Sequence, residues 1–269
     1  MSLLTLSCKN CAGQITMVPG KSVPTCPFCD SEQMEETSLD SQVVQPEQLI
    51  DFEAEESVAD KSFRTLASSS WWYPSEIRNA KLELKRIYIP AWSWSVDIES
   101  YYAGLKSAST KSGKKPFEGH HQHSFSQILT PASTGVSLNE INDIAPFDTQ
   151  KAQPFQEAEL QYPFEPALLS QDAATQLALK KSKSEHEAML KSQLGALELK
   201  CSSIVHRLEG DPALLPIYIG VYKRNDIPYR IVVNGLTGKI TGTIPYDKGK
   251  IIGVCVAVLL LIVICLGIL

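Results

Sequence analysis

Two pairs of cysteines near the N-terminus constrain the fold of this chain more than any other feature. Cys8 and Cys11 form one CxxC pair, and Cys26 and Cys29 form a second pair, separated from the first by fourteen residues. A CxxC segment bends the chain so that two thiolates point at one ion, and two such segments complete a tetrahedral shell of four sulfur atoms. Soft thiolates in this geometry select Zn²⁺. The spacing predicts a zinc ribbon over residues 1–33, with a hairpin between the two pairs.

The predicted metal site is structural, because all four ligands come from the protein. No coordination position is left for a water molecule, which argues against metal catalysis. No other motif indicates an active site or an organic cofactor. The phosphate-binding loop pattern fails around Gly238, since Val233 stands where its first glycine is needed and Ile240 replaces its Ser or Thr. The sequence therefore predicts no catalytic residue, no cofactor-binding residue and a non-enzymatic protein.

Three histidines, His120, His121 and His123, form a second candidate site. In an extended strand His121 and His123 face one way and His120 faces the other, and Glu118 is the only acidic residue close by. A polar loop or strand edge is the favoured interpretation, with a second metal as the alternative. Cys201, alone on a predicted helix, is interpreted as a small buried residue and not as a nucleophile.

The C-terminal segment 251–269 consists of nineteen apolar residues without a charge. As a helix with a rise of 1.5 Å per residue it would reach about 28 Å, close to the thickness of a bilayer core. The sequence predicts a transmembrane helix here and the lipid bilayer as a partner; the alternative is a buried core helix. Lys239, Lys248 and Lys250 precede the segment and no charge follows it, so we expect a single-pass protein with a cytoplasmic N-terminal body.

Charge divides the chain unevenly. Residues 1–60 carry two basic and eleven acidic side chains, whereas residues 61–269 carry 23 basic and 19 acidic ones. Ser, Gln and Glu dominate much of the acidic part, which predicts a flexible acidic linker over residues 34–59. The ribbon has no basic stripe to neutralise phosphates, so protein contact is favoured over nucleic-acid contact at the ribbon.

Hydrophobic periodicity predicts a body domain over residues 60–247. Its expected elements are helices over 60–70 and 75–85, a strand over 86–96 with a hairpin partner at 101–105, a long helix over 167–208 and a three-stranded meander over 214–245. The predicted fold class is α+β. It comprises a zinc ribbon, a flexible acidic linker, a mixed domain of helices and antiparallel hairpins with one long helix, and a C-terminal transmembrane helix.

Several motifs occur in a characteristic order: the two cysteine pairs, IYIPAW at 87–92, SQILTPAS at 126–133, and LLPIY and VNGLTGKITG after residue 213. Together they resemble bacterial TFIIB-type zinc-ribbon membrane proteins of unknown function, which are often loosely described as primosomal or helicase-like. A helicase activity is not implied, because the chain has no Walker motif and is too short for helicase domains.

Two functions are compatible with these features. The first is a non-enzymatic, tail-anchored membrane adaptor or scaffold whose structural zinc ribbon contacts a cytoplasmic protein partner. The alternative is a membrane-associated nucleic-acid-binding zinc-ribbon protein, in which the more basic body contacts phosphates. The two differ in their expected response to salt, since phosphate binding weakens steeply with ionic strength.

Overall fold

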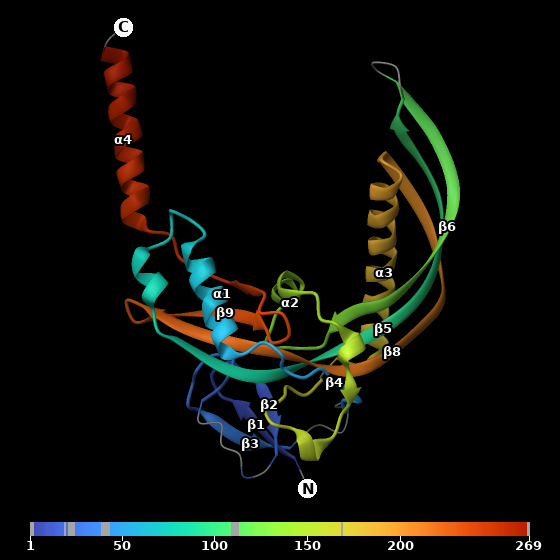
Figure 1. Ribbon diagram of the computed structural model, residues 1–269, viewed down its shortest axis with the longest axis horizontal. Helices are drawn as coiled ribbons and strands as arrows, with labels where there is room; N and C mark the ends of the chain where they lie inside the picture. The colour runs from blue at the N-terminus through green and yellow to red at the C-terminus, as the bar shows by residue number, and fades with distance from the viewer. Residues whose placement is uncertain are drawn as a thin grey trace. The chain divides into compact units, whose positions relative to one another are not determined.

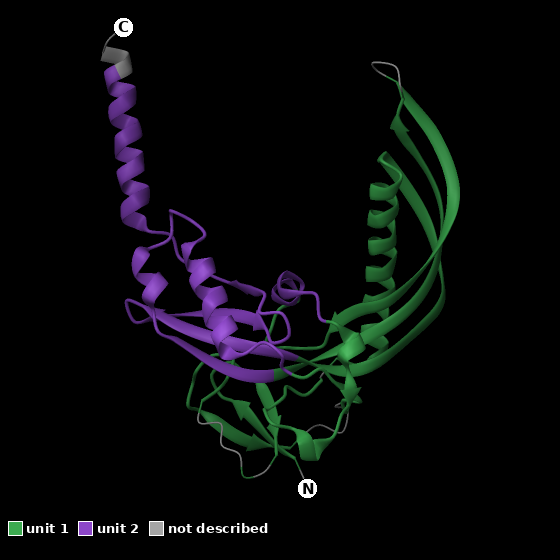
Figure 2. Ribbon diagram, viewed as in Figure 1, with its two compact units in different colours: residues 1–51, 88–138, 148–215 green, residues 52–87, 139–147, 216–269 purple. Residues whose placement is uncertain are grey.

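The structure is a computed structural model that describes residues 3–18, 20, 25–38, 44–108, 113–167 and 169–267 (Figure 1). The chain forms two compact units, each assembled from three segments (Figure 2). Unit 1 comprises residues 1–51, 88–138 and 148–215. Unit 2 comprises residues 52–87, 139–147 and 216–269.

The N-terminal part of unit 1 is a three-stranded antiparallel sheet. Its strands are β1 (Leu4–Cys8), β2 (Gln14–Met17) and β3 (Met34–Thr37), in the order β2-β1-β3. Ile15 and Met17 fill its small core and are almost fully buried. This is the sheet expected of a zinc ribbon. Most of the predicted turn between the cysteine pairs, residues 19 and 21–24, lies outside the described residues.

The rest of unit 1 is built on very long strands. They are β5 (Leu82–Ser107), β6 (Lys114–Pro131) and β8 (Ala196–Arg224), and β5 pairs with both β6 and β8. The helix α3 (Gln171–Gln193) lies along β5, β6 and β8 (Figure 1). Every fourth residue of α3 is buried, and these residues are Ala174, Ala178, Ser182, His186 and Leu190. The small side chains at the first three of these positions let that part of the helix approach the sheet closely.

Short elements complete unit 1. They are β4 (Gln48–Leu49), β7 (Gln153–Pro154), and the 3₁₀ helices η2 (Thr149–Lys151) and η3 (Glu157–Glu159). β4 lies between β7 and β8, parallel to β8.

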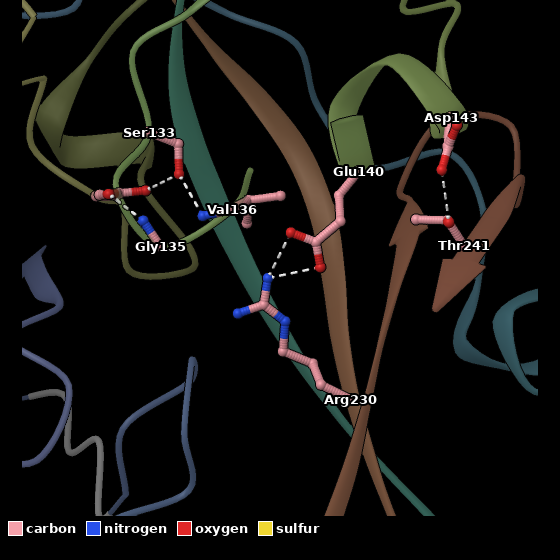
Figure 3. A network of polar contacts seen from close by, with 8 residues as sticks. Ser133, Gly135, Val136, Glu140, Asp143, Arg230 and Thr241 are labelled. Carbon is pink, nitrogen blue, oxygen red and sulfur yellow. Dashed lines mark hydrogen bonds and ion pairs between the residues drawn. The ribbon is translucent and has the colours of Figure 1, made fainter. Parts of the chain in front are cut away.

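Unit 2 is built around one hydrophobic core. α1 (Glu56–Ser68), the 3₁₀ helix η1 (Ser75–Asn79), β9 (Ile227–Asn234) and β10 (Ile240–Gly242) surround a core that contains Phe63, Tyr218 and Tyr222. The short helix α2 (Leu138–Ile144) is tied to the strands by side chains (Figure 3). Arg230 Nη2 donates to both carboxylate oxygens of Glu140 at 2.8 and 2.9 Å.

The predicted meander over 214–245 is confirmed. β8 pairs with β9 and β9 with β10, all antiparallel. Asn225 and Asp226 form the first turn with φ values of 52° and 61°. Two consecutive residues with positive φ define the type I′ turn that matches the twist of a hairpin, and Asn and Asp tolerate it.

The predicted fold class is wrong: the chain is mixed α/β with a large sheet of seven strands. The main cause is the predicted long helix over 167–208, which ends near Gln193. Gly195, with φ of 59°, follows the helix and turns the chain. Residues 196–208 then enter β8, where Leu197 and Ile204 are exposed. The pairing of β8 with β5 outweighs the weak helical periodicity of this segment.

Two further expectations fail in the same way. The stretch 101–105 is not a separate hairpin strand, because β5 continues to Ser107 and its antiparallel partner is β6. The flexible linker predicted over 34–59 contains β3, β4 and the start of α1. Backbone pairing with β1 and β8 orders these parts of an acidic segment whose composition alone suggested disorder.

The apolar C-terminal segment forms α4 (Lys248–Gly267). Asp247 Oδ1 accepts hydrogen bonds from the backbone N–H groups of Gly249 and Lys250 and begins the helix. Within the part of the chain that the structure describes, no helix has both the length and the apolar character needed to cross a membrane. The first turn of α4 contains Lys248 and Lys250, and the last described residue of the helix is Gly267. The predicted transmembrane helix over 251–269 and the predicted single-pass location with a cytoplasmic N-terminal body are therefore wrong.

Candidate metal centre

The two CxxC segments make the same backbone turn. The N–H of Cys8 donates to the carbonyl of Gly13 at 3.0 Å, and the N–H of Cys26 donates to the carbonyl of Ser31 at 2.8 Å. In each case the acceptor lies five residues after the first cysteine of the pair. Each loop is thereby closed by main-chain atoms, which leaves the cysteine side chains free to point to one side.

The residue after each pair adopts a left-handed conformation. Ala12 has φ of 58° and Asp30 has φ of 63°. Their N–H groups return to the carbonyls of Cys8 and Cys26 at 2.9 and 3.0 Å. An aspartate tolerates this conformation better than an alanine does, because its short polar side chain can form local hydrogen bonds. Asp30 therefore fits the turn although it is not a glycine.

The four cysteine sulfur atoms meet at one point. They all lie within 4.8 Å of one another. Cys8 Sγ is 3.6 Å from Cys29 Sγ, and Cys11 Sγ is 3.7 Å from Cys26 Sγ. Two sulfur ligands of a tetrahedral zinc ion, each bonded at about 2.3 Å, lie about 3.8 Å apart. A disulfide would require about 2.05 Å. The predicted ligand set Cys8, Cys11, Cys26 and Cys29 is thus assembled as a cluster that can hold a metal ion.

The thiols of this cluster differ in acidity. Burial raises the pKa of Cys8, but hydrogen bonds from the N–H groups of Cys11 and Asn10 and from neighbouring thiols outweigh it and bring the value to about 7. Burial raises the pKa of Cys26 far above its usual range, and the thiol of Cys11 adds to the rise. A cation at the centre would favour deprotonation of both, since the thiolate is the form that binds metal.

Phe28, inside the second pair, anchors the ribbon to the rest of unit 1. Its side chain is buried between two glycines. A Cβ atom added to Gly13 would lie 2.6 Å from the Phe28 ring, and one added to Gly135 would lie 2.2 Å from it. Both distances are far below van der Waals contact. The glycines are therefore required for the close approach of the ring, and Gly135 brings a loop more than a hundred residues away against the metal cluster.

A buried carboxylate holds that loop in place. Glu165 is 1% exposed. Its Oε1 accepts hydrogen bonds from the backbone N–H groups of Thr134 and Gly135 at 2.5 and 2.9 Å, and its Oε2 accepts one from the hydroxyl of Ser133. Ser133 Oγ in turn accepts from the N–H of Val136 at 2.9 Å (Figure 3). Burial raises the pKa of Glu165, although these hydrogen bonds oppose the rise.

Backbone pairing gives the ribbon a second attachment. Thr16 of β2 and Phe164 exchange two hydrogen bonds, at 2.6 and 2.9 Å. On the other side of the same segment, the N–H of Glu165 donates to the carbonyl of Tyr88 in β5 at 2.9 Å. The segment at 163–165 thus joins the ribbon to the large sheet within unit 1.

The histidine group is rearranged relative to the sequence-based expectation. His120 is exposed on one face of β6, and its ring lies 5.9 Å from that of Tyr101. His121 and His123 share the other face, as predicted from strand alternation, and there they meet His186 of α3. His186 was not selected from the sequence. A signal was available, because it lies four residues from both Ser182 and Leu190 on the buried stripe of α3.

Cys201 lies on β8 and not on the predicted helix. Its side chain is half-buried, and burial together with the charge of Glu187 raises its pKa. A thiol with a raised pKa is a poor nucleophile at neutral pH, which agrees with its interpretation as a small packing residue.

Comparison with known proteins adds no relative. No family model, no curated protein and no solved structure matches this chain. The functional argument therefore depends on the residues and their geometry.

Proposed function

We propose that this chain is a non-enzymatic adaptor or scaffold protein whose N-terminal ribbon, folded around one structural Zn²⁺, contacts a protein partner. The observation that carries the proposal is the closed set of four sulfur atoms of Cys8, Cys11, Cys26 and Cys29, all within 4.8 Å of one another. A metal held by four protein ligands has no position left for a water molecule or a substrate, so its role is to stabilise the fold.

The ribbon has one sheet edge suited to a partner. In the order β2-β1-β3, the β2 edge is occupied by Phe164, whereas β3 has β1 on one side and, among the described residues, no strand on the other. An unpaired strand edge offers N–H and C=O groups to an extended peptide. Glu35 and Glu36 are exposed on β3. Glu35 already pairs with Lys9 at 2.8 Å. The carboxylate of Glu36 beside this edge favours a partner with basic side chains and disfavours phosphate.

The metal assignment is tested by element analysis of the purified full-length chain. We expect the wild type to hold one zinc ion more per chain than a variant with Cys26 and Cys29 changed to Ser, because two ligands cannot complete the tetrahedral shell. Cys201→Ser is the matched control, since it removes a half-buried thiol outside the cluster. A wild-type chain purified without zinc, or a zinc content that is the same before and after the two cysteine changes, would contradict the assignment.

The partner is tested by crosslinking and capture of the full-length chain in the presence of nuclease. We expect a defined protein that survives nuclease treatment and is lost when Glu35 and Glu36 are both changed to Lys. The control changes Glu198 and Glu209 to Lys, which alters the net charge equally at two exposed, ion-paired glutamates of β8. The same loss in the control would remove β3 from the proposal. Recovery of nucleic acid that disappears with nuclease or moderate salt would favour the nucleic-acid-binding alternative.

A further inference from the structure

Three histidine rings lie together where α3 packs on β6. Their residues are far from the cysteine cluster in sequence. The ring of His186 lies 5.3 Å from that of His121 and 5.9 Å from that of His123, and the rings of His121 and His123 lie 6.2 Å apart. Two of them come from alternate positions of one strand, and the third comes from a helix packed on it. A half-buried pair on a strand with a buried third imidazole facing it is a natural arrangement for a metal with nitrogen ligands.

Two of the nitrogen atoms already face each other. His121 Nδ1 lies 3.0 Å from His186 Nε2. Two nitrogen ligands of a tetrahedral ion, bonded at about 2.0–2.1 Å, lie about 3.4 Å apart. A small outward movement of one ring would therefore admit an ion between them. Without an ion, the contact is a hydrogen bond in which one ring must donate and the other accept.

The other nitrogen of His186 has a fixed partner. His186 Nδ1 lies 2.8 Å from Ser100 Oγ, and Ser100 Oγ lies 2.7 Å from Ser203 Oγ. Both Ser100 and His186 are fully buried. When Nδ1–H donates to Ser100 and Ser100 donates to Ser203, the lone pair of His186 is on Nε2, directed at His121. Outer hydrogen bonds of this kind fix the tautomer and orientation of metal-binding histidines.

From this geometry we propose that His121, His123 and His186 form a binding site for a divalent transition metal such as Zn²⁺, separate from the cysteine cluster. His121 Nδ1 and His186 Nε2 are the first two ligands. His123 is the third ligand and has to turn its ring on binding. Among the described residues, only the four cysteines already have three or more potential ligand atoms within 4.8 Å of one another, so the three histidine nitrogens do not yet meet this distance. In the structure the His123 ring packs edge-on against Phe125 at 4.5 Å. The proposal does not rest on the function of the ribbon.

The test is zinc stoichiometry and titration with the full-length chain. We expect the wild type to bind one more Zn²⁺ than variants carrying His121→Gln or His186→Gln. His120→Gln is the matched control, because its ring lies one residue away on the opposite face of β6 and should leave the stoichiometry unchanged. Ser100→Ala should weaken the additional ion by about 10- to 100-fold, the usual effect of losing an outer hydrogen bond to a ligand. His123→Gln should weaken it by at least as much.

A measurement on the wild type covers the case in which a variant fails to fold. Zinc added to the chain labelled at its histidine rings should shift the ring NMR signals of His121, His123 and His186 and leave those of His120 and His206 in place. Equal stoichiometry in the wild type and the His121→Gln variant, or titration shifts confined to His120 and His206, would overturn the proposal. Unchanged affinity in His123→Gln would overturn the three-histidine site.

Discussion

The cysteine cluster and the histidine cluster lie in the same unit but are assembled in opposite ways. Each cysteine pair is closed by hydrogen bonds between residues no more than five positions apart. The histidines meet only because α3 packs on β6, and the His121–His186 contact joins residues 65 positions apart. A local arrangement depends on its own turn and its ion, whereas a distant one depends on the tertiary packing that brings its parts together.

The largest effect is expected on removing the metal from the cysteine cluster. Structural zinc ions contribute about 10–16 kcal/mol of apparent binding free energy in isolated zinc-finger peptides, and much of it is folding free energy. Changing Cys26 and Cys29 to Ser should therefore unfold the ribbon and expose the amides of Thr16 and Phe164 to hydrogen exchange. If the fold of the ribbon depends only on its own turns and its ion, the amides of α3 should keep their protection from exchange. Hydrogen-exchange mass spectrometry would show this. Equal loss of protection in both regions would break the distinction between the two clusters.

The second prediction concerns the packing between the ribbon and its loop. Gly135→Val places a Cβ atom 2.2 Å from the Phe28 ring, far below van der Waals contact, so the ring or the loop must shift. Overpacking of this kind costs about 1–3 kcal/mol. Denaturant unfolding should show the loss. Gly253→Val is a suitable control, because a Cβ at Gly253 meets no atom within 4 Å. A ribbon that still binds its metal in Gly135→Val would confirm that the cysteine turns do not need the distant loop.

This contrast explains what the sequence could and could not predict. The ligands Cys8, Cys11, Cys26 and Cys29 could be named because their chemistry and spacing are both local. His186 could not be assigned to a site, because its partners are set by the pairing of β5 with β6 and by the docking of α3. The helix expected over 167–208 fails for a related reason. Residues after Gly195 have apolar positions compatible with a helix, and only their pairing with β5 makes them a strand.

The third prediction is an acid sensitivity of the histidine cluster in the absence of added metal. The pKa of His186 is lowered in the folded chain from its ordinary value of 6.5, so the unfolded chain takes up the proton first as the pH falls. The contribution of His186 to stability is therefore complete above about pH 6.5 and is lost as the pH falls from there towards the lower folded value. The free energy of unfolding of the wild type relative to His186→Gln should decrease over this range. A difference that is independent of pH, or that grows on acidification, would contradict the inferred burial of a neutral ring.

The smallest effect is expected within the cysteine turns, where Ala12 and Asp30 occupy equivalent left-handed positions. An L-residue with a Cβ atom in this conformation costs roughly 1–2 kcal/mol, which glycine avoids, while aspartate recovers part of the cost through local hydrogen bonds. Ala12→Gly should therefore stabilise the metal-loaded ribbon by about 1 kcal/mol, reduced somewhat because glycine also has more freedom in the unfolded chain. Asp30→Gly should give a smaller gain. Thermal unfolding of the two variants beside the wild type measures both changes. Destabilisation by Ala12→Gly would mean that the backbone of the first turn is held by packing on its side chain and not by the hydrogen bonds around Cys8, which would make this cluster less local than its sequence suggests.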